Sequence, residues 1–450
     1  MKHIPIIALF LLRAAAAAAC VVFALYWRSP ILASIRMPAL AAFIVVALAF
    51  IVCEIWWLRR KRHPYVIAAI STVIALIASG GLALTLLSEA RFHWQRHDVL
   101  RADAASLERL GRHIIVGYRD RDELRRLIER RAVAGVFVTA HNVRGKDAAT
   151  IRSEIASLQA IRKAQGLPPL LIATDQEGGG VSRMSPPLPR QETLGEIVRK
   201  HPNDTERRKA IQTFATEKGR ALADLGFNLN FAPVVDINHN IVNDDDRYTR
   251  VFERAISDDP AMVTAVAGDY CAALIQTGIH CTLKHFPGLG RVVEDTHLED
   301  ADLTAPRATL ESSDWVPFRA LMHQAGAFTM LGHARLIAVD KDRPASFSKA
   351  VVSDLLRGEW NHDGVLVTDD FNMGAVFASD AGIGEASVLA LNAGVDLILI
   401  SYDGGQVYPV MLALLRADAS GRLRRDQLER SDRRLAGARS LGASPVADRR

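Results

Sequence analysis

Residues 280–290 read HCTLKHFPGLG, and residues 295–297 read DTH. The run from Cys281 to His285 has the composition of a short buried strand, and a Pro-Gly pair that favours a turn ends it. The loop beyond the turn places an acid two residues before a histidine. Catalytic residues are often carried by loops on a rigid scaffold. This stretch therefore predicts a strand that ends in a loop of functional, titratable side chains.

The alternation of strand and helix recurs on both sides of this stretch, from about residue 98 onward. Runs of β-branched residues predict strands at 113–116, 135–139, 170–174, 229–232, 281–285, 328–332, 365–369 and 396–400. Amphipathic segments predict helices at 121–131, 148–164, 205–225, 261–277, 348–360 and 383–392. Because strands separated by helices pair in parallel, the pattern predicts an α/β fold, a (β/α)8 TIM barrel. A doubly wound open sheet is the alternative.

The first part of the chain has a different composition. Residues 4–27, 37–58 and 65–87 are apolar runs, each close to the roughly 20 residues that a membrane-spanning helix needs. The first contains Arg13 and also resembles a signal peptide, but the two runs that follow favour a retained anchor. The basic loop at 59–62 is expected to stay in the cytoplasm, which would put everything after residue 88 on the other side of the membrane.

Composition excludes several function classes. The net charge of +5 is modest, and no basic stripe with interleaved aromatic residues predicts a nucleic-acid partner. No Walker or GxGxxG pattern follows a strand, and no CxxC or Cys/His cluster suggests a metal, so no cofactor is expected. Cys271 and Cys281 are compatible with a disulfide, although two buried free thiols are the favoured interpretation.

Polar residues follow almost every predicted strand. They are His141-Asn142, Asp175, Asp236, Lys284-His285, His333, Asp369-Asp370 and Ser401-Tyr402-Asp403. In a (β/α)8 barrel the active site lies where strands end and the following loops begin. The sequence therefore predicts that these side chains share one face of the molecule.

Two acidic patterns have the residue types of catalysis. One of Asp369 and Asp370 fits a nucleophile at a strand end, and either also fits the cap of the next helix. Asp295 and His297 fit a dyad in which the carboxylate orients an imidazole that transfers protons, or else an acidic surface loop.

A second group of residues has the types that bind sugar hydroxyls. Asp175 precedes a glycine turn, and Arg183 follows it closely; the alternative is a charged surface turn. For Asp236, Lys284 and His285, the alternative is that they are buried, satisfied polar residues of the barrel, and His323 and His333 share that interpretation.

Taken together, the segments resemble glycoside hydrolase family 3, and within it the single-domain β-N-acetylglucosaminidases of the NagZ type. KHFPGLG followed by Asp-Thr-His is similar to the signature KHFPGHG…D-[ST]-H of that subgroup. Further similar segments are DQEGGGVSRM at 175–184, NFAPVVDI at 230–237, FTMLGHARLIAVDKDRPASFSK at 328–349 and GVLVTDDFNMGAV at 364–376. The likeness runs from about residue 105 to 440. Departures such as Gly180 and Leu289 concern substrate preference more than chemistry.

The resemblance implies a role for each matching position. Asp369 would be the nucleophile, His297 the acid/base and Asp295 its partner. The residues that would hold N-acetylglucosamine are Asp175, Arg183, Lys284, His285 and one arginine, for which Arg254 is preferred to Arg250. The implied enzyme is a retaining β-N-acetylhexosaminidase that removes terminal β-linked N-acetylglucosamine from cell-wall or related glycans.

This interpretation predicts a membrane anchor over residues 1–90 and a catalytic domain over 98–445. The bacterial inner membrane, spanned several times, is the expected location, with the catalytic domain facing the periplasm. The expected partners are a glycan and the lipid bilayer. The alternatives are an N-acetylglucosaminide phosphorylase, a β-glucosidase-type member of the family, and a non-catalytic glycan-binding membrane protein.

Overall fold

The computed structural model describes residues 4–60 and 64–442. It divides into two compact units, Met1–Asp98 and Val99–Arg450. Each unit has its own packing and is described by itself.

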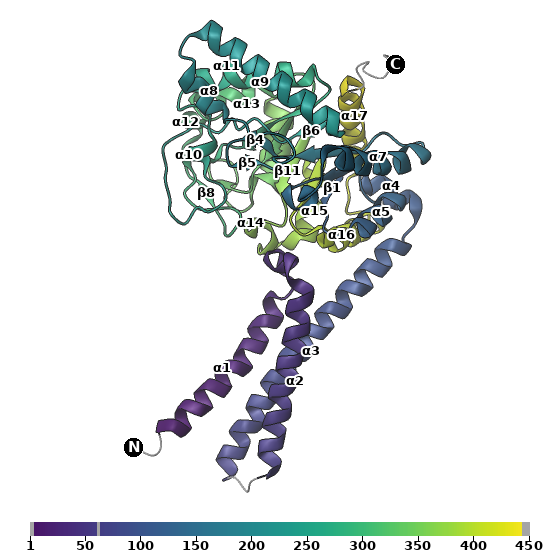
Figure 1. Ribbon diagram of the computed structural model, residues 1–450, viewed down its shortest axis with the longest axis vertical. Helices are drawn as coiled ribbons and strands as arrows, with labels where there is room; N and C mark the ends of the chain where they lie inside the picture. The colour runs from purple at the N-terminus through teal and green to yellow at the C-terminus, as the bar shows by residue number, and fades with distance from the viewer. Residues whose placement is uncertain (1–3, 61–63, 443–450) are drawn as a thin grey trace. The chain divides into compact units, whose positions relative to one another are not determined.

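The first unit consists of long apolar helices: α1 (Ile4–Tyr26), α2 (Arg36–Arg60) and α3 (Tyr65–Arg101), with a short 3-10 turn between α1 and α2 at Pro30–Ser34 (Figure 1). All three are long and apolar enough to cross a membrane. Helix α3 continues past residue 87, where its apolar run was predicted to end. The polar residues after Leu87 include no proline or glycine, so nothing in the sequence breaks the helix there.

Arg13, the charge inside the first apolar run, has partners on both other helices. Its Nε donates to Glu54 Oε1 on α2 (2.7 Å), and its Nη2 donates to Ser71 Oγ on α3 (2.8 Å). The guanidinium also lies 4.6 Å from the ring centre of Trp57. A charged residue in an apolar helix is costly unless it is paired. Arg13 therefore links the three helices.

The second unit is a barrel of parallel strands. They are β1 (Ile114–Gly117), β2 (Gly135–Phe137), β3 (Leu171–Thr174), β6 (Leu229–Asn230), β7 (Cys281–Phe286), β9 (Ala327–Leu331), β11 (Leu366–Asp370) and β12 (Leu397–Ile400). The 8-stranded sheet has the order β6-β3-β2-β1-β12-β11-β9-β7, so each strand lies beside its neighbours in the chain. Parallel bridges Leu229–His280 and Val234–Lys284 join the two ends. The predicted α/β TIM-type barrel is confirmed, and this near-closure excludes the open, doubly wound sheet.

Helices surround the strands (Figure 1). They are α4 (Ala104–Gly111), α5 (Arg121–Glu129), α6 (Ala140–Val143), α7 (Ala148–Ala164), α8 (Leu194–Lys200), α9 (Asp204–Leu225), α10 (Val251–Arg254), α11 (Pro260–Ile275), α12 (Arg307–Ser312), α13 (Val316–Leu321), α14 (Gly374–Phe377), α15 (Gly382–Ala393), α16 (Val407–Ala419) and α17 (Arg425–Gly442). The predicted helix at 348–360 is a π-helix, η4 (Ala350–Glu359). Side-chain caps from Asp120, Asp147 and Asn203 fix the starts of α5, α7 and α9.

The barrel interior is filled by side chains from the strands. Its core cluster includes Ile115, Phe137, Leu171, Phe231 and Val367, all nearly or fully buried. Loops and two small sheets, β4 (Gln176–Gly178) with β5 (Val181–Ser182) and β8 (Asp302–Leu303) with β10 (Arg335–Leu336), lie beyond the strands. The interior is therefore a packed core, and space for a ligand is left to the loops.

The expectation of two free thiols at Cys271 and Cys281 is wrong. The two residues form a disulfide between α11 and the first residue of β7, with their Cα atoms 5.5 Å apart. The connection from α11 to β7 is short, so the last turns of the helix return beside the start of the strand. Sequence spacing does not reveal this, because it depends on which face of the helix meets the sheet.

Candidate active site

The predicted polar residues gather at the carboxyl ends of β3, β7 and β11. Asp175 follows the last residue of β3, Lys284 and His285 lie near the end of β7, and Asp369 near the end of β11. Parallel strands bring these ends to the same rim of a barrel, so residues far apart in the sequence become neighbours.

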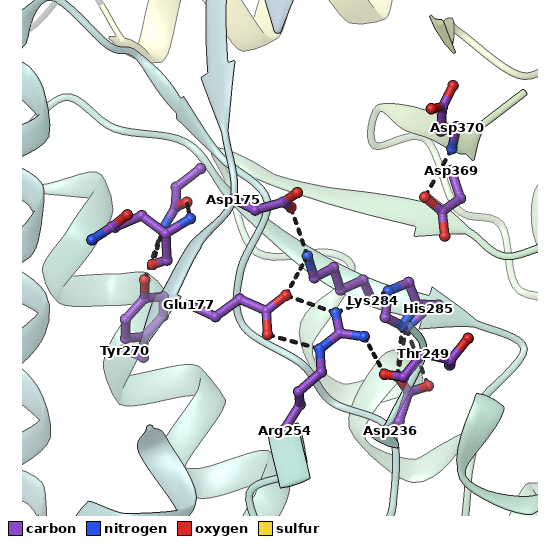
Figure 2. A network of polar contacts seen from close by, with 12 residues as sticks. Asp175, Glu177, Asp236, Thr249, Arg254, Tyr270, Lys284, His285, Asp369 and Asp370 are labelled. Carbon is purple, nitrogen blue, oxygen red and sulfur yellow. Dashed lines mark hydrogen bonds and ion pairs between the residues drawn. The ribbon is translucent and has the colours of Figure 1, made fainter. Parts of the chain in front are cut away.

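Lys284 lies between two carboxylates (Figure 2). Its Nζ is 2.9 Å from Asp175 Oδ1 and 2.7 Å from Glu177 Oε1. Arg254 binds the same Glu177 with two nitrogens, at 3.0 and 2.7 Å. The side chain of Lys284 is only 3% exposed, so these charges are almost removed from water. The result is a compact set of charged donors and acceptors with the chemistry to bind a polyhydroxylated ring.

In this network, ion pairing has a larger effect on the pKa values of the side chains than burial has. Burial alone would raise the pKa of Glu177, but Arg254 and Lys284 hold it well below its ordinary value. Burial alone would lower the pKa of Lys284, but the carboxylates of Asp175 and Glu177 raise it above its ordinary value. Glu177, Arg254 and Lys284 therefore stay charged near neutral pH.

Lys218 on α9 lies behind the Glu177 loop. Its Nζ donates to the backbone oxygen of Glu177 at 2.5 Å and lies 4.1 Å from the ring centre of Phe214. Burial lowers the pKa of Lys218 to about 7, an effect that Glu177 only partly offsets. Through the backbone of Glu177, this lysine holds strand β4 in place.

His285 is oriented by Asp236. The ring Nδ1 of His285 is 2.7 Å from Asp236 Oδ2, and the same carboxylate accepts from the backbone nitrogens of His285 (3.1 Å) and Leu289 (2.8 Å). A carboxylate only accepts, so Nδ1 carries a proton and Nε2 is left with its lone pair, 3.5 Å from Arg254 Nη2. For Asp236, the interpretation as a buried, satisfied residue agrees with this geometry.

Asp369 and Asp370 have different surroundings. Asp370 accepts from the Ser401 hydroxyl (2.6 Å), from the backbone nitrogens of Ser401 (2.8 Å) and Tyr402 (2.9 Å), and from Asn372. Among the described residues, the Asp369 carboxylate accepts a hydrogen bond from the backbone nitrogen of Asp370 (2.8 Å). Asp370 therefore holds the loop after β12, and the Asp369 carboxylate keeps its capacity for a ligand (Figure 2).

The charge on Asp369 is favoured by its neighbours. Burial alone would raise the pKa of Asp369. The positive charges that His285, His333 and His297 carry when protonated outweigh burial and leave the pKa of Asp369 below its ordinary value. An anionic carboxylate at this position is suited to nucleophilic attack.

Asp295 and His297 form a hydrogen-bonded pair. His297 Nδ1 is 2.8 Å from Asp295 Oδ1, and Asp295 also accepts from Thr249 Oγ1 (2.9 Å) and the backbone nitrogen of Tyr248 (3.0 Å). The Asp295 side chain is 2% exposed and that of His297 is 37% exposed. Burial would raise the pKa of Asp295, but the hydrogen bond from His297 lowers it to about 2. Asp295 is therefore not part of a solvated acidic surface.

A close backbone contact brings this pair to β11. Gly374, just after β11, donates from its backbone nitrogen to His297 O at 2.8 Å. A Cβ at Gly374 would lie 2.3 Å from Leu298 O, so only glycine permits this approach. The long loop after β7 is thus held against the loop that follows Asp369.

Arg254 and Arg250, the two candidates for the sugar-binding arginine, differ in the residues that they contact. Arg254 lies in the buried network, whereas Arg250 pairs with Glu253 and is exposed. The backbone nitrogen of Arg183 donates to Asp175 O at 3.0 Å, and its side chain is exposed at the rim.

Within residues 4–60 and 64–442, no group of three or more histidine, cysteine or acidic side chains is arranged to hold a metal ion.

Sequence reasoning did not single out three residues of this region. Glu177 was visible inside the segment DQEGGG but carried no distinguishing signal, and Thr249 had none. His333 was noted as a buried residue; its Nε2 faces the backbone oxygen of Asp370 at 3.0 Å and its Nδ1 faces Ser346 Oγ at 2.8 Å. Burial lowers the pKa of His333 to about 4, so a neutral ring supports the loop of Asp370.

Comparisons with known proteins identify the family of this chain. Residues 104–438 match the model of the glycosyl hydrolase family 3 N terminal domain. A β-hexosaminidase of Xanthomonas euvesicatoria pv. vesicatoria is 32% identical over 272 residues, covering 60% of this chain and 77% of that protein. The β-hexosaminidase LpqI of Mycobacterium tuberculosis is 31% identical over 338 residues, covering 73% of this chain and 81% of the relative.

A solved structure supports the same relationship. The glycoside hydrolase family 3 β-N-acetylglucosaminidase of a Paenibacillus species superposes with a TM-score of 0.68 at 30% identity, over 76% of this chain and 64% of that one. The resemblance inferred from the motifs is thereby confirmed. The chain belongs to glycoside hydrolase family 3.

Proposed function

We propose that this protein is a retaining β-N-acetylhexosaminidase that removes terminal β-linked N-acetylglucosamine from a glycan. The observation that carries the proposal is the hydrogen bond from Gly374 N to His297 O at 2.8 Å, which holds the Asp295–His297 pair against the loop that follows Asp369. The named relatives support the activity, because they are β-hexosaminidases.

In the first step, the Asp369 carboxylate attacks the anomeric carbon as the glycosidic carbon–oxygen bond breaks. His297 donates its Nε2 proton to the leaving oxygen, since its Nδ1 is engaged with Asp295. The sugar is then bound to Asp369 as an ester. Asp295 stabilises the imidazolium form of His297 and fixes its orientation.

In the second step, neutral His297 takes a proton from water, and the water oxygen attacks the anomeric carbon. The bond to Asp369 breaks, the carboxylate is restored, and the sugar leaves with its original configuration. A histidine acid/base carries no negative charge beside the anionic nucleophile, so the two groups do not repel each other as two carboxylates would.

The remaining polar residues would bind the N-acetylglucosamine unit: Asp175, Arg183, Arg254, Lys284 and His285. The chemistry of the network supports this role. Lys284 and Asp175 are held together at 2.9 Å and can contact neighbouring hydroxyls of one ring.

We also propose that residues 1–90 anchor the protein in a bacterial inner membrane through three spans, with a catalytic domain over 98–445 in the periplasm. Three apolar helices and a basic loop at 59–62 support this arrangement. The Cys271–Cys281 disulfide supports it as well, because disulfides persist in oxidising compartments such as the periplasm.

The test uses the full chain in detergent with 4-nitrophenyl β-N-acetylglucosaminide, beside Asp369→Ala and His297→Ala. We expect release of 4-nitrophenol by the wild type, a loss of more than about a thousandfold in Asp369→Ala, and rescue of His297→Ala by azide. Proton NMR of the first product should show the β-anomer. The α-anomer would contradict the double displacement, and sugar 1-phosphate formed in phosphate buffer would identify a phosphorylase.

A further inference from the structure

A cavity of about 420 Å³ lies between η4, the end of α15 and α17, and we call it the basal cavity. Its lining residues His362 and Asp363 precede β11, and Ala393 precedes β12. The basal cavity is therefore at the amino ends of these strands, whereas Asp369 of the active site is near the carboxyl end of β11. Small-molecule sites commonly have volumes of roughly 300–1,000 Å³, so this space is large enough for a ligand.

Basic side chains dominate the wall of the basal cavity. Five of them line it: Lys349, Arg357, Arg424, Arg430 and Arg434. Two carboxylates, Asp354 and Asp363, line it as well, while Asp396 and Asp426 accept from arginines of the wall at 2.7 and 2.9 Å. With all four of these carboxylates counted, the positive charges remain in excess. The wall therefore favours an anionic group.

Helix α17 places donors with spare capacity on this wall. Gln427, Arg430 and Arg434 are spaced by three and four residues, so they share one face of the helix, and all three line the cavity. Arg430 Nη2 is 3.8 Å from Asp426 Oδ2, which is too far for a hydrogen bond. Within the part of the chain that the structure describes, Arg434 Nη2 is buried and has no hydrogen-bond partner. A buried donor without a partner costs free energy, and a ligand that accepts from it recovers that cost.

The opposite wall is a π-helix, η4, a rare conformation that is often found at functional sites. It carries Arg357, whose Nη1 donates to the backbone oxygens of His362 (2.8 Å) and Gly364 (2.7 Å). The positive charge of Arg357 is thus fixed in position. Burial, together with the charge of Arg357, lowers the pKa of His362 to about 2, so this lining residue is a neutral ring. The wall is therefore rigid, and its charge comes from lysine and arginine.

We propose that the basal cavity is a second binding site of this protein, for a small phosphate ester that carries hydroxyl groups. Guanidinium groups match the oxygens of a phosphoryl group, and Gln427, Arg430 and Arg434 provide donors from three side chains. Asp354 and Asp363 are 59% and 86% exposed and can accept from hydroxyls of the organic part. A dissolved sugar phosphate and the glycerophosphate headgroup of a lipid share this chemistry. The inference does not depend on the glycosidase activity.

The test is isothermal titration calorimetry of the full chain in a nonionic detergent at constant ionic strength. The ligands are glucose 6-phosphate, glycerophosphorylglycerol (the headgroup of phosphatidylglycerol without its acyl chains), inorganic phosphate and glucose. The variants are Arg430→Gln and Gln427→Leu. Arg433→Gln is the matched control, because Arg433 is exposed on the same helix and does not line the cavity. The Tm of each variant checks that it is folded.

We expect at least one of the two esters to bind at least tenfold more tightly than inorganic phosphate, and glucose not to bind. Arg430→Gln should weaken ester binding about tenfold or more, the effect of losing hydrogen bonds from a charged group, and Gln427→Leu about threefold. Arg433→Gln should stay within twofold of wild type. Tighter binding of glucose 6-phosphate would identify a soluble ligand, and tighter binding of glycerophosphorylglycerol would identify a lipid headgroup.

Three results would overturn the proposal. Neither ester binds, or inorganic phosphate binds as tightly as the esters, or Arg430→Gln changes ester affinity no more than Arg433→Gln does. The last result would place the bound ester elsewhere on the molecule. Release of 4-nitrophenol from 4-nitrophenyl β-N-acetylglucosaminide should be the same in all these variants, so failure at the basal cavity leaves the proposed glycosidase function untouched.

Discussion

Asp369 and Asp370 are adjacent in the chain but differ in what surrounds their carboxylates. Five donors from the chain hold Asp370, while the Asp369 carboxylate is left to act on a ligand. The same division of roles separates Asp295, whose oxygens are engaged, from His297, which is partly exposed. In each pair the more buried residue, Asp370 or Asp295, accepts hydrogen bonds that fix the surrounding loops. The more exposed residue, Asp369 or His297, is the one proposed to react.

Asp295→Asn should test the proposed dyad. The amide keeps the size of the side chain but removes the charge that stabilises the imidazolium, so we expect kcat/KM for N,N′-diacetylchitobiose to fall about a hundredfold to ten-thousandfold. N-acetylglucosaminyl fluoride needs less help from an acid and should lose less in the first step. Because the pKa of Asp295 is about 2, the acid limb of the wild-type pH profile should not arise from this residue. Equal losses of kcat/KM, which reports the first step, on both substrates would contradict the role.

Lys218→Met should alter how stability depends on pH. The pKa of Lys218 is about 7 in the folded protein against an ordinary 10.5, so between these values the unfolded chain binds a proton that the folded chain does not. Wild-type stability therefore rises with pH in this window, by about 1.4 kcal/mol per unit. Methionine does not titrate, so Lys218→Met removes this pH dependence. The gain in free energy of unfolding over wild type should be greatest at or below pH 7 and shrink toward pH 10. Urea unfolding at several pH values measures it.

A matched control for this experiment lies on the same helix. Lys209 of α9 is exposed, and Lys209→Met should leave the pH dependence of stability unchanged. A constant difference between wild type and Lys218→Met across pH 6 to 10 would show that Lys218 keeps an ordinary pKa in the folded protein.

At the scale of elements, α11 and β7 are joined covalently by Cys271 and Cys281. Strand β7 supplies both Lys284 and His285, so the disulfide sits at the start of a strand whose end is in the active site. Replacing both cysteines by serine should lower the free energy of unfolding by about 2–3 kcal/mol, the value expected for a closed loop of this length.

Thermal unfolding with and without reductant measures this effect. Reductant should lower the Tm of the wild type and leave that of the double serine variant unchanged. Mass spectrometry after alkylation of the unfolded chain should find Cys20 and Cys53 modified and the other two blocked. Alkylation of all four cysteines without reductant would contradict the disulfide.

At the scale of the whole molecule, the proposed topology predicts opposite sides of the membrane for the two ends of the chain. With the basic loop at 59–62 in the cytoplasm, three spans leave the N-terminus in the cytoplasm and the catalytic domain outside. In spheroplasts, external protease should remove an epitope tag fused after residue 450 and spare one fused before residue 1. Lysis should expose both tags, and the reverse pattern before lysis would overturn the orientation.

Much of the fold was predictable because it depends on local patterns. The helix at 148–164 and the eight strands follow from the spacing of apolar residues, and the chain order of those strands is kept around the barrel. The motif at 284–297 and the acids at 369–370 also mark the site, because loops after barrel strands meet at one rim. Boundaries were less predictable: α3 continues to Arg101, since no residue after its apolar run opposes a helix.

What the sequence by itself determined about this protein is the family, the barrel and the polar residues at the strand ends, because each is encoded in a short stretch of chain. Only the tertiary structure decided that Cys271 binds Cys281, that Arg254 and not Arg250 meets Glu177, and that Thr249 supports Asp295. These contacts join loops distant in sequence, and their partners are chosen by burial and charge in three dimensions.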